Sequence, residues 1–378
     1  MRLNSLVAVL AVAAASSAVW TFRRQGWLEA AFEEVETDVF RFKLWWQPLP
    51  GVLGPVTVWL IREAKTEGPA KWVLVDTGFP DLWPQRWHSK LMAAVKALAP
   101  PGQMQAILLT HTHIDHAGGL PGLLAAYPEA ALVVHEAELP FLTGQAAFAE
   151  QPSFGMLASR AAGLYKPATS QVPADRLHLL RNAGSPSGQP TAEGLRQAGV
   201  ATLSWTPTPG HSPGHVSYLH EPSGSLLAGD ALLLMEPALK LGSPASPDAA
   251  GNNSTALSYE YPLTWFIVTV NNAGDLSSFS TLPANPAAAG GRLLLQAPIA
   301  SLYLTPSLLC PRPKCNHEQY HRSVCALAGL PFRRLYPTHD VTGRGLSHDE
   351  VVAFAAHLPA CTGMKLPGQA AEGASTAA

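Results

Sequence analysis

The sequence feature that most constrains this chain of 378 residues is the stretch THTHIDHAGG at residues 110–119. Three imidazoles and one carboxylate lie within six residues there, at His111, His113, Asp115 and His116. Histidine nitrogens and carboxylate oxygens are ligands that zinc takes in proteins. The apolar residues AILL directly before this stretch predict a buried strand. We therefore expect a metal-binding loop at the end of a core strand.

The spacing within this stretch indicates contact with two metal ions. Because one residue separates His111 from His113, an extended backbone would project both imidazoles to the same side, toward one ion. Asp115 and His116 follow at the turn, where they can face a second ion. A catalytic zinc site takes three protein ligands and keeps a fourth position open, so each ion needs another donor from elsewhere in the chain. The best candidates are His211 for the first ion, His339 for the second ion, and Asp230 as a carboxylate that bridges both.

Alternating strand and helix signals along the chain predict an α/β architecture. Segments rich in Val, Phe, Trp and Ile predict three strands of one sheet at Val35–Leu49, Val56–Ile61 and Lys71–Val75. Helical spacing covers Leu82–Leu98, and we expect helices and loops that could cover the site at Glu136–Ala198. Further strands are predicted at 131–134, 201–206, 216–219, 225–228 and 332–336, and further helices at 120–127, 316–327 and 347–358.

Charge and composition limit the partners and mark two irregular segments. The formal net charge is −2 and no long block of Lys or Arg occurs, which argues against nucleic acid and favours a small-molecule substrate. Only four residues between 242 and 309 are charged, and this stretch is rich in Ser, Ala, Asn, Gly and Pro, which predicts a partly disordered insertion. We also expect a disordered tail at residues 361–378. The four cysteines all lie in the last quarter of the chain, so they do not form a framework for the whole fold.

The N-terminal residues predict a targeting or anchor segment at about residues 1–26. The apolar stretch Leu6–Trp20 follows Arg2, is itself followed by two arginines, and no acidic residue precedes Glu29. It is shorter than the roughly 20 residues that a membrane-spanning helix needs. The pattern favours the secretory pathway or membrane attachment through the N-terminus, with import into a chloroplast or mitochondrion as the alternative.

Five motifs in a fixed order carry a family resemblance. They are DTG at 76–78, HTHIDH at 111–116, PGH at 209–211, GD at 229–230 and PTHD at 337–340. Together they resemble the metallo-β-lactamase-fold hydrolase superfamily, over about residues 35–240 and 311–360. The resemblance implies an αββα four-layer sandwich at residues 30–360, interrupted by the insertion at 242–309, with a binuclear metal site at the edge between two sheets.

The resemblance also implies the roles of the site residues. His111, His113 and His211 would hold one metal, Asp115, His116 and His339 the other, and Asp230 would bridge the two. Asp115 would also orient the nucleophilic water or move a proton. The expected cofactor is two zinc ions, with iron or manganese as possible replacements.

The expected activity is that of a zinc-dependent hydrolase, in which a hydroxide bound by both metals attacks a small ester, thioester or lactone. More specific alternatives are a glyoxalase-II-like thioesterase and a lactonase, although no tyrosine closely follows Asp230 of the kind that lactonases use. A non-hydrolytic metal-binding member of the superfamily is the alternative from a different class. Asp76 is interpreted as a turn residue that binds neighbouring backbone amides, and His215 as a structural hydrogen-bonding residue. Four further histidines are interpreted as ordinary surface or edge residues: His135, His178, His220 and His348.

Overall fold

The computed structural model describes residues 31–49, 52–63, 68–81, 86–146, 174–181, 190–232, 317–340, 343–356 and 358–361. The predicted N-terminal segment at 1–26 and the insertion at 242–309 lie outside the described residues. Within the described part of the chain, no helix has both the length and the apolar character needed to cross a membrane.

The first half of the chain forms a seven-stranded sheet in which the strands follow one another in sequence order. Neighbouring strands are antiparallel from β1 to β4 and parallel from β4 to β7. The strands are β1 (Glu33–Glu36), β2 (Val39–Leu49), β3 (Val52–Arg62), β4 (Trp72–Val75), β5 (Met104–Leu108), β6 (Ala131–His135) and β7 (Leu177–Leu180). The helices that accompany them are α2 (Trp87–Leu98), α3 (Ile114–Ala117), α4 (Leu120–Ala126) and α5 (Leu139–Leu142).

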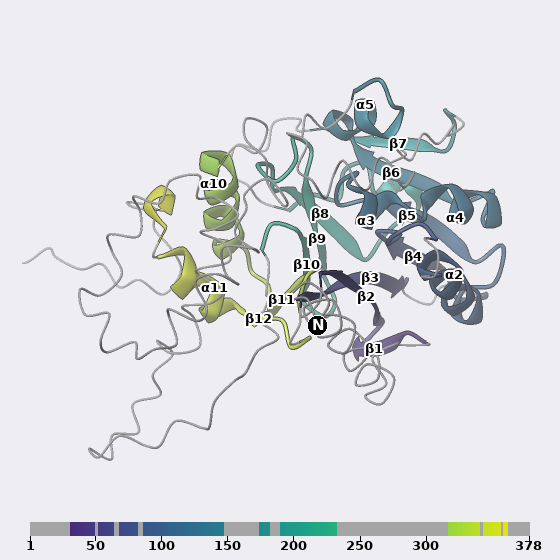
Figure 1. Ribbon diagram of the computed structural model, residues 1–378, viewed down its shortest axis with the longest axis horizontal. Helices are drawn as coiled ribbons and strands as arrows, with labels where there is room; N and C mark the ends of the chain where they lie inside the picture. The colour runs from purple at the N-terminus through teal and green to yellow at the C-terminus, as the bar shows by residue number, and fades with distance from the viewer. Residues whose placement is uncertain are drawn as a thin grey trace, which may run out of the picture.

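The second half forms a five-stranded sheet in the order β12-β11-β10-β9-β8. Only the β10–β11 pair is parallel in this sheet. Its strands are β8 (Leu203–Pro207), β9 (Val216–His220), β10 (Ser225–Gly229), β11 (Arg334–Pro337) and β12 (Leu346–Ser347), and its helices are α10 (His317–Ala328) and α11 (His348–Ala355). Figure 1 shows α2 and α4 on one side of the molecule and α10 and α11 on the other, with the sheets between them.

The buried apolar residues form three clusters, which lie between four layers. Strand β3 contributes to two of these clusters, because successive side chains of a strand point to opposite faces of its sheet. Val58 and Leu60 belong to the cluster that includes Leu91 of α2, whereas Trp59 and Ile61 belong to the cluster shared with the second sheet. The third cluster joins the second sheet to α10 and α11. The αββα sandwich implied by the resemblance is therefore confirmed.

Two differences from the predicted elements have a clear physical reason. The single strand predicted at Val35–Leu49 is split into β1 and β2 by a tight turn at Asp38, whose φ of 66° ends the extended conformation. Strand β7 lies in the region where only helices and loops were expected. It is four residues long, lies at the sheet edge and carries one fully buried side chain, so it lacks a periodic pattern.

The last helix and the end of the chain are fixed by specific contacts. Ser347 and Glu350 form a capping box at the start of α11, as the sequence SHDE indicates. Cys325 of α10 forms a disulfide with Cys361, which ends a short 3₁₀ helix at Pro359–Cys361. Cys361 is buried and therefore belongs to the fold, although the predicted tail began at this residue.

Candidate metal centre

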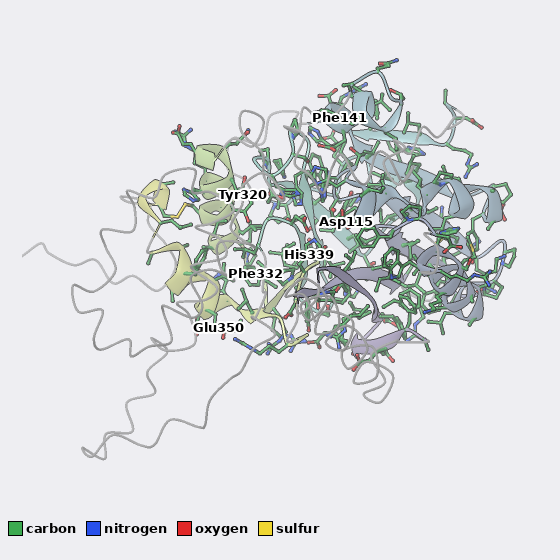
Figure 2. The ribbon with its side chains drawn as sticks, in the orientation of Figure 1. Asp115, Phe141, Tyr320, Phe332, His339 and Glu350 are labelled. Carbon is green, nitrogen blue, oxygen red and sulfur yellow. A yellow bond between two sulfur atoms is a disulfide. The ribbon has the colours of Figure 1, made fainter. Side chains whose placement is uncertain are left out.

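All seven predicted ligands follow the C-terminal ends of strands, at the edge where the two sheets meet. His111 follows β5 of the first sheet, Asp230 directly follows β10, and His339 follows β11. His211 lies on the loop between β8 and β9. Figure 2 shows Asp115 and His339 close together in the middle of the molecule, although they are far apart in sequence. The fold thus gathers residues from both sheets into one site.

The first group consists of three imidazole nitrogens that point at one another. His111 Nε2 lies 2.8 Å from His113 Nδ1 and 3.2 Å from His211 Nε2, and the two latter nitrogens are 2.9 Å apart. Two ligands of a tetrahedral zinc ion, each 2.0–2.1 Å from the metal, lie about 3.3 Å apart. The three nitrogens therefore form a slightly compressed version of the triangle that a metal ion requires.

The second group joins a carboxylate and two imidazoles. Asp115 Oδ2 lies 3.3 Å from His339 Nε2 and 3.7 Å from His116 Nε2. These atoms, like those of the first group, lie within 4.8 Å of one another and could hold an ion. The prediction that His339, beyond the long insertion, reaches this group depended only on motif order, and the structure places it there.

Asp230 lies between the two groups. Its Oδ2 is 3.2 Å from His211 Nε2 and 3.4 Å from His339 Nε2, so one carboxylate oxygen faces both groups. Its Oδ1 is 3.3 Å from His116 Nε2. Both Oδ1 of Asp230 and Nε2 of His116 are buried and have no partner in hydrogen-bond geometry. Because buried polar atoms are rarely unsatisfied, this pair fits a site that is completed by a cation.

Hydrogen bonds behind the ligands fix the tautomers of two histidines. His116 Nδ1 donates to Asp76 Oδ2 at 2.8 Å, and His339 Nδ1 donates to the backbone oxygen of Pro55 at 2.8 Å. With Nδ1 held as a donor, Nε2 of each imidazole faces the centre and is the atom that would bind a metal once its own proton is displaced. Asp76 also accepts from the backbone amide of Thr110 at 2.8 Å, which lies 34 positions further along the chain and is not the neighbour in the turn that the sequence predicts. Its contact with His116 was not predicted.

The pKa values divide the ligands into two classes. Burial holds the pKa of His111 and of His211 well below the ordinary value, so both imidazoles stay neutral, as metal ligation requires. Burial also acts to lower the pKa of His339, but the carboxylates of Asp230 and Asp115 outweigh it and raise the value to about 10. Although burial opposes it, the neighbouring imidazoles lower the pKa of Asp115 to about 2. The second group is therefore a strongly negative environment that favours a cation, either a proton or a metal.

The other histidines do not all lie where the sequence indicated. His215 is buried, its Nε2 accepts from the backbone amide of Asp230 at 3.0 Å, and its Nδ1 lies 2.8 Å from Thr208 Oγ1, which fits a structural role. His135 and His220 are buried as well, so their interpretation as surface or edge residues was wrong. Each is the last residue of a strand whose residues are all buried, so the side chain is covered although it is polar.

One functional candidate was missed. Glu138 follows β6 at the end of a 3₁₀ helix, Glu136–Glu138, and is fully buried. Its carboxylate contacts both loops that carry the first ligand group, through Thr112 and Ser212. A single glutamate in an irregular segment carries no recognisable pattern in the sequence. What marks Glu138 is its full burial, which is unusual for a glutamate and is seen only in the structure.

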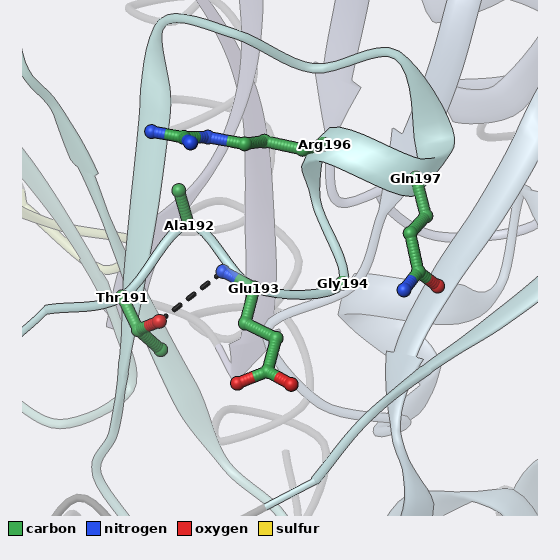
Figure 3. A pocket seen from close by; sticks show the side chains of 6 residues that line it. All are labelled: Thr191, Ala192, Glu193, Gly194, Arg196 and Gln197. Carbon is green, nitrogen blue, oxygen red and sulfur yellow. Dashed lines mark hydrogen bonds between the residues drawn. The ribbon is translucent and has the colours of Figure 1, made fainter.

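The described residues also line a surface pocket of about 410 Å³ at Thr191–Gln197, beside a 3₁₀ helix at Arg196–Ala198 (Figure 3). None of its six lining residues is one of the seven ligand candidates.

Comparison with known proteins agrees with this geometry. The family model of the metallo-beta-lactamase superfamily matches residues 51–339. A probable metallo-hydrolase of Bacillus subtilis, YflN, is 26% identical over 170 residues, which cover 44% of this chain and 58% of that protein. A second one, YybB, is 28% identical over 179 residues, 47% of this chain and 63% of the relative.

A third relative matches over a much shorter stretch. The hydroxyacylglutathione hydrolase of Parasynechococcus marenigrum is 50% identical over 44 residues, 11% of this chain and 18% of that protein. The chain thus spans less than two thirds of the length of the curated relatives it matches. Since the family model covers well over half of the sequence, this chain belongs to the metallo-beta-lactamase superfamily.

Proposed function

We propose that this protein is a binuclear metal-dependent hydrolase that cleaves a small ester, thioester or lactone. The observation that carries the proposal is the position of Asp230, one oxygen of which faces His211 of the first ligand group and His339 of the second. A carboxylate placed between two ligand groups suits a pair of ions that share it. Similarity to probable metallo-hydrolases supports hydrolysis as the reaction type.

Two divalent cations bound here would supply Lewis acidity, which lowers the pKa of water and stabilises negative charge on the attacked carbonyl oxygen. Zinc is the expected metal, and iron or manganese could take its place. The first group holds three imidazoles and no carboxylate, whereas the second holds Asp115 with His116 and His339. The first site would therefore be the one with the greater preference for zinc, since oxygen ligands also suit manganese and iron.

Asp115 is the carboxylate best placed to contact the attacking water. Its side chain is 18% exposed, whereas Asp230 is 4% exposed and Asp76 is 1% exposed. Its pKa of about 2 keeps it ionised at neutral pH, so it accepts a hydrogen bond and cannot serve as an acid. We expect Asp115 to orient the water by accepting its hydrogen bond, while the more deeply buried Asp230 serves only as a ligand.

A thioester is the preferred substrate class among the three. A relative that is 50% identical over 44 residues is named for the hydrolysis of hydroxyacylglutathione, and an acylglutathione is a thioester. The low net charge of the chain argues against phosphodiester substrates on nucleic acid.

A substrate panel tests the proposal. Thioesters, lactones, β-lactams and phosphodiesters would be assayed with protein loaded with zinc, manganese or iron, and bound metal would be counted. We expect two ions per chain and turnover of thioesters above the other classes. His113→Ala should lose metal and hydrolysis together, whereas His178→Ala, which changes a histidine outside the ligand groups, should lose neither. Full activity in His113→Ala would refute the assignment.

A further inference from the structure

Glu138 makes four hydrogen bonds to two loops that are far apart in sequence. Its Oε2 accepts from the backbone amide of Thr112 at 3.0 Å and from Thr112 Oγ1 at 2.6 Å. Its Oε1 accepts from Ser212 Oγ at 2.7 Å and from the backbone amide of Gly214 at 2.8 Å. Each carboxylate oxygen therefore serves one loop.

These partners are the immediate neighbours of the first ligand group. Thr112 lies between His111 and His113, and Ser212 directly follows His211. Glu138 itself contributes no atom to the groups that could hold an ion. It thus connects the two loops that must approach each other for three imidazole nitrogens to converge.

We propose that Glu138 is a positioning residue, which holds the 111–113 loop and the 211–214 loop together so that the first metal site is formed before the ion arrives. The inference rests on the proposed function, because it assigns a task at the same centre. It predicts that the loops keep their arrangement in metal-free protein and that metal affinity depends on this carboxylate.

The chemistry of the contact requires a carboxylate at this position. An ionised carboxylate is an acceptor only and has about four lone-pair sites, which matches the four donors that converge on Glu138. A glutamine would offer one oxygen and one NH₂ group, so one loop would face a donor where it needs an acceptor. The side chain of Glu138 also packs closely against the 211–214 loop, because a Cβ on Gly214 would lie 2.8 Å from Cγ of Glu138.

The fold supplies a matched control in Glu63, a second buried glutamate with a comparable set of donors. It accepts from the backbone amides of Ala201 and Thr202 and from Thr202 Oγ1, at 3.1, 3.2 and 2.8 Å. These contacts tie the end of β3 to the segment before β8 and involve no ligand. Glu63→Gln should therefore cost stability in the same way as Glu138→Gln, without touching the metal site.

The experiment measures cobalt(II) affinity of the metal-free full chain by competition with a chromophoric chelator, alongside denaturant unfolding. We expect Glu138→Gln to weaken binding of the three-histidine site by 10- to 100-fold, the range typical of groups that orient metal ligands. Glu63→Gln should keep wild-type affinity while losing stability. Hydrogen exchange on metal-free wild type should show protected amides at Thr112 and Gly214, and in Glu138→Gln alone the amide that faces the new NH₂ group should lose this protection.

Two outcomes would overturn the inference. One is wild-type cobalt affinity in Glu138→Gln. The other is an equal loss of affinity in Glu63→Gln, which would mean that the loss in Glu138→Gln comes from lower stability of the whole fold. If Glu138→Gln does not fold, Ser212→Ala removes one of the four donors and should still weaken cobalt binding severalfold, and an unchanged affinity would then refute the role.

The inference and the proposed function fail in different ways. A wild type that binds two ions and hydrolyses substrate, together with a fully competent Glu138→Gln, would refute only the positioning role. A wild type that binds no cobalt would refute the proposed function, and the positioning role with it.

Discussion

Replacing Asp76 by asparagine should damage the metal centre without changing a single ligand. Asp76 has a φ of 63°, in the left-handed region that asparagine tolerates as well as aspartate does, so the backbone is not strained by the change. The side chain is 1% exposed and the imidazole of His116 is fully buried, so no solvent can replace the lost contact. Asparagine can keep the bond from the amide of Thr110, but its NH₂ group would face Nδ1 of His116.

The size of the expected loss of metal affinity follows from the tautomer of His116. With a donor at position 76, His116 avoids a donor–donor contact only by moving its proton from Nδ1 to Nε2, the atom that must bind the metal. Forcing the metal-binding tautomer back costs about one charge-assisted hydrogen bond, about 1.5–3 kcal/mol. This corresponds to a loss of affinity of about 10- to 100-fold, as is usual when the partner of a ligating histidine is changed.

The assay is a competition titration of the metal-free protein with zinc and with cobalt(II), following the weaker of the two binding steps. The matched control is Asp38→Asn, because Asp38 is the other non-glycine residue with a left-handed backbone in the part of the chain that the structure describes, with a φ of 66°. Its side chain is 30% exposed and pairs with Arg62 at the surface, which is worth less than about 1 kcal/mol. If Asp76→Asn binds both ions as tightly as Asp38→Asn does, the assignment of Asp76 as the residue that orients His116 is wrong.

Three further predictions concern pH, the disulfide and one glycine. Since the pKa of His339 is raised to about 10 and nearby carboxylates also raise that of His116, an ion at the second group must displace their protons, so affinity at that group should rise at least tenfold per unit between about pH 6 and pH 8, as measured by titration at several pH values. Cys361→Ser removes a disulfide to Cys325 that spans 36 residues and should lower the free energy of unfolding by about 4 kcal/mol in denaturant titrations, with an equal effect of reductant on wild type. Gly210→Ala should destabilise by about 3 kcal/mol or more, because φ is 126° and the new Cβ would lie 2.3 Å from the backbone nitrogen of Tyr320. Normal thermal stability of this variant would contradict the close packing of Gly210 against Tyr320.

The ligand motif was predictable because its information is local. Residues 111–116 place four donors at a strand end, and the two-residue period of an extended chain already implies that His111 and His113 share a target. The later ligands Asp230 and His339 were found from the order of the motifs, since they carry no local pattern of their own. The structure now brings each of them within 3.5 Å of another predicted ligand.

The missed features depend on contacts between distant segments. Glu138 matters because a 3₁₀ helix after β6 lies against the loop at 211–214, a proximity that no sequence period records. The contact of Asp76 with His116 likewise arises because β4 and β5 are parallel neighbours whose C-terminal ends meet. Strand β7 was missed for a different reason, since an edge strand of four residues gives too short a pattern to recognise.

The two sheets meet at the same edge where the candidate ligand groups lie. The backbone amide of Thr57 in β3 donates to the oxygen of Thr338 at 3.1 Å, directly before His339. The amide of Val216 in β9 donates to the oxygen of Thr110 at 3.0 Å, directly before His111. Each ligand group therefore lies beside a hydrogen bond that joins one sheet to the other.

Because His111 comes from the first sheet and His211 from the second, an ion held by both would also hold the sheets together. The same is true of His116 and His339 in the second group. An ion at 100 times its dissociation constant would add about 2.7 kcal/mol to the free energy of unfolding, a large part of the 5–15 kcal/mol typical of a domain. In the metal-free protein no metal ion compensates the buried charge of Asp230, and its burial costs desolvation energy. Protonated histidines beside it offset this cost. The proposed metal site is thus also a contact between the two sheets, so that metal binding there would contribute directly to the stability of their packing.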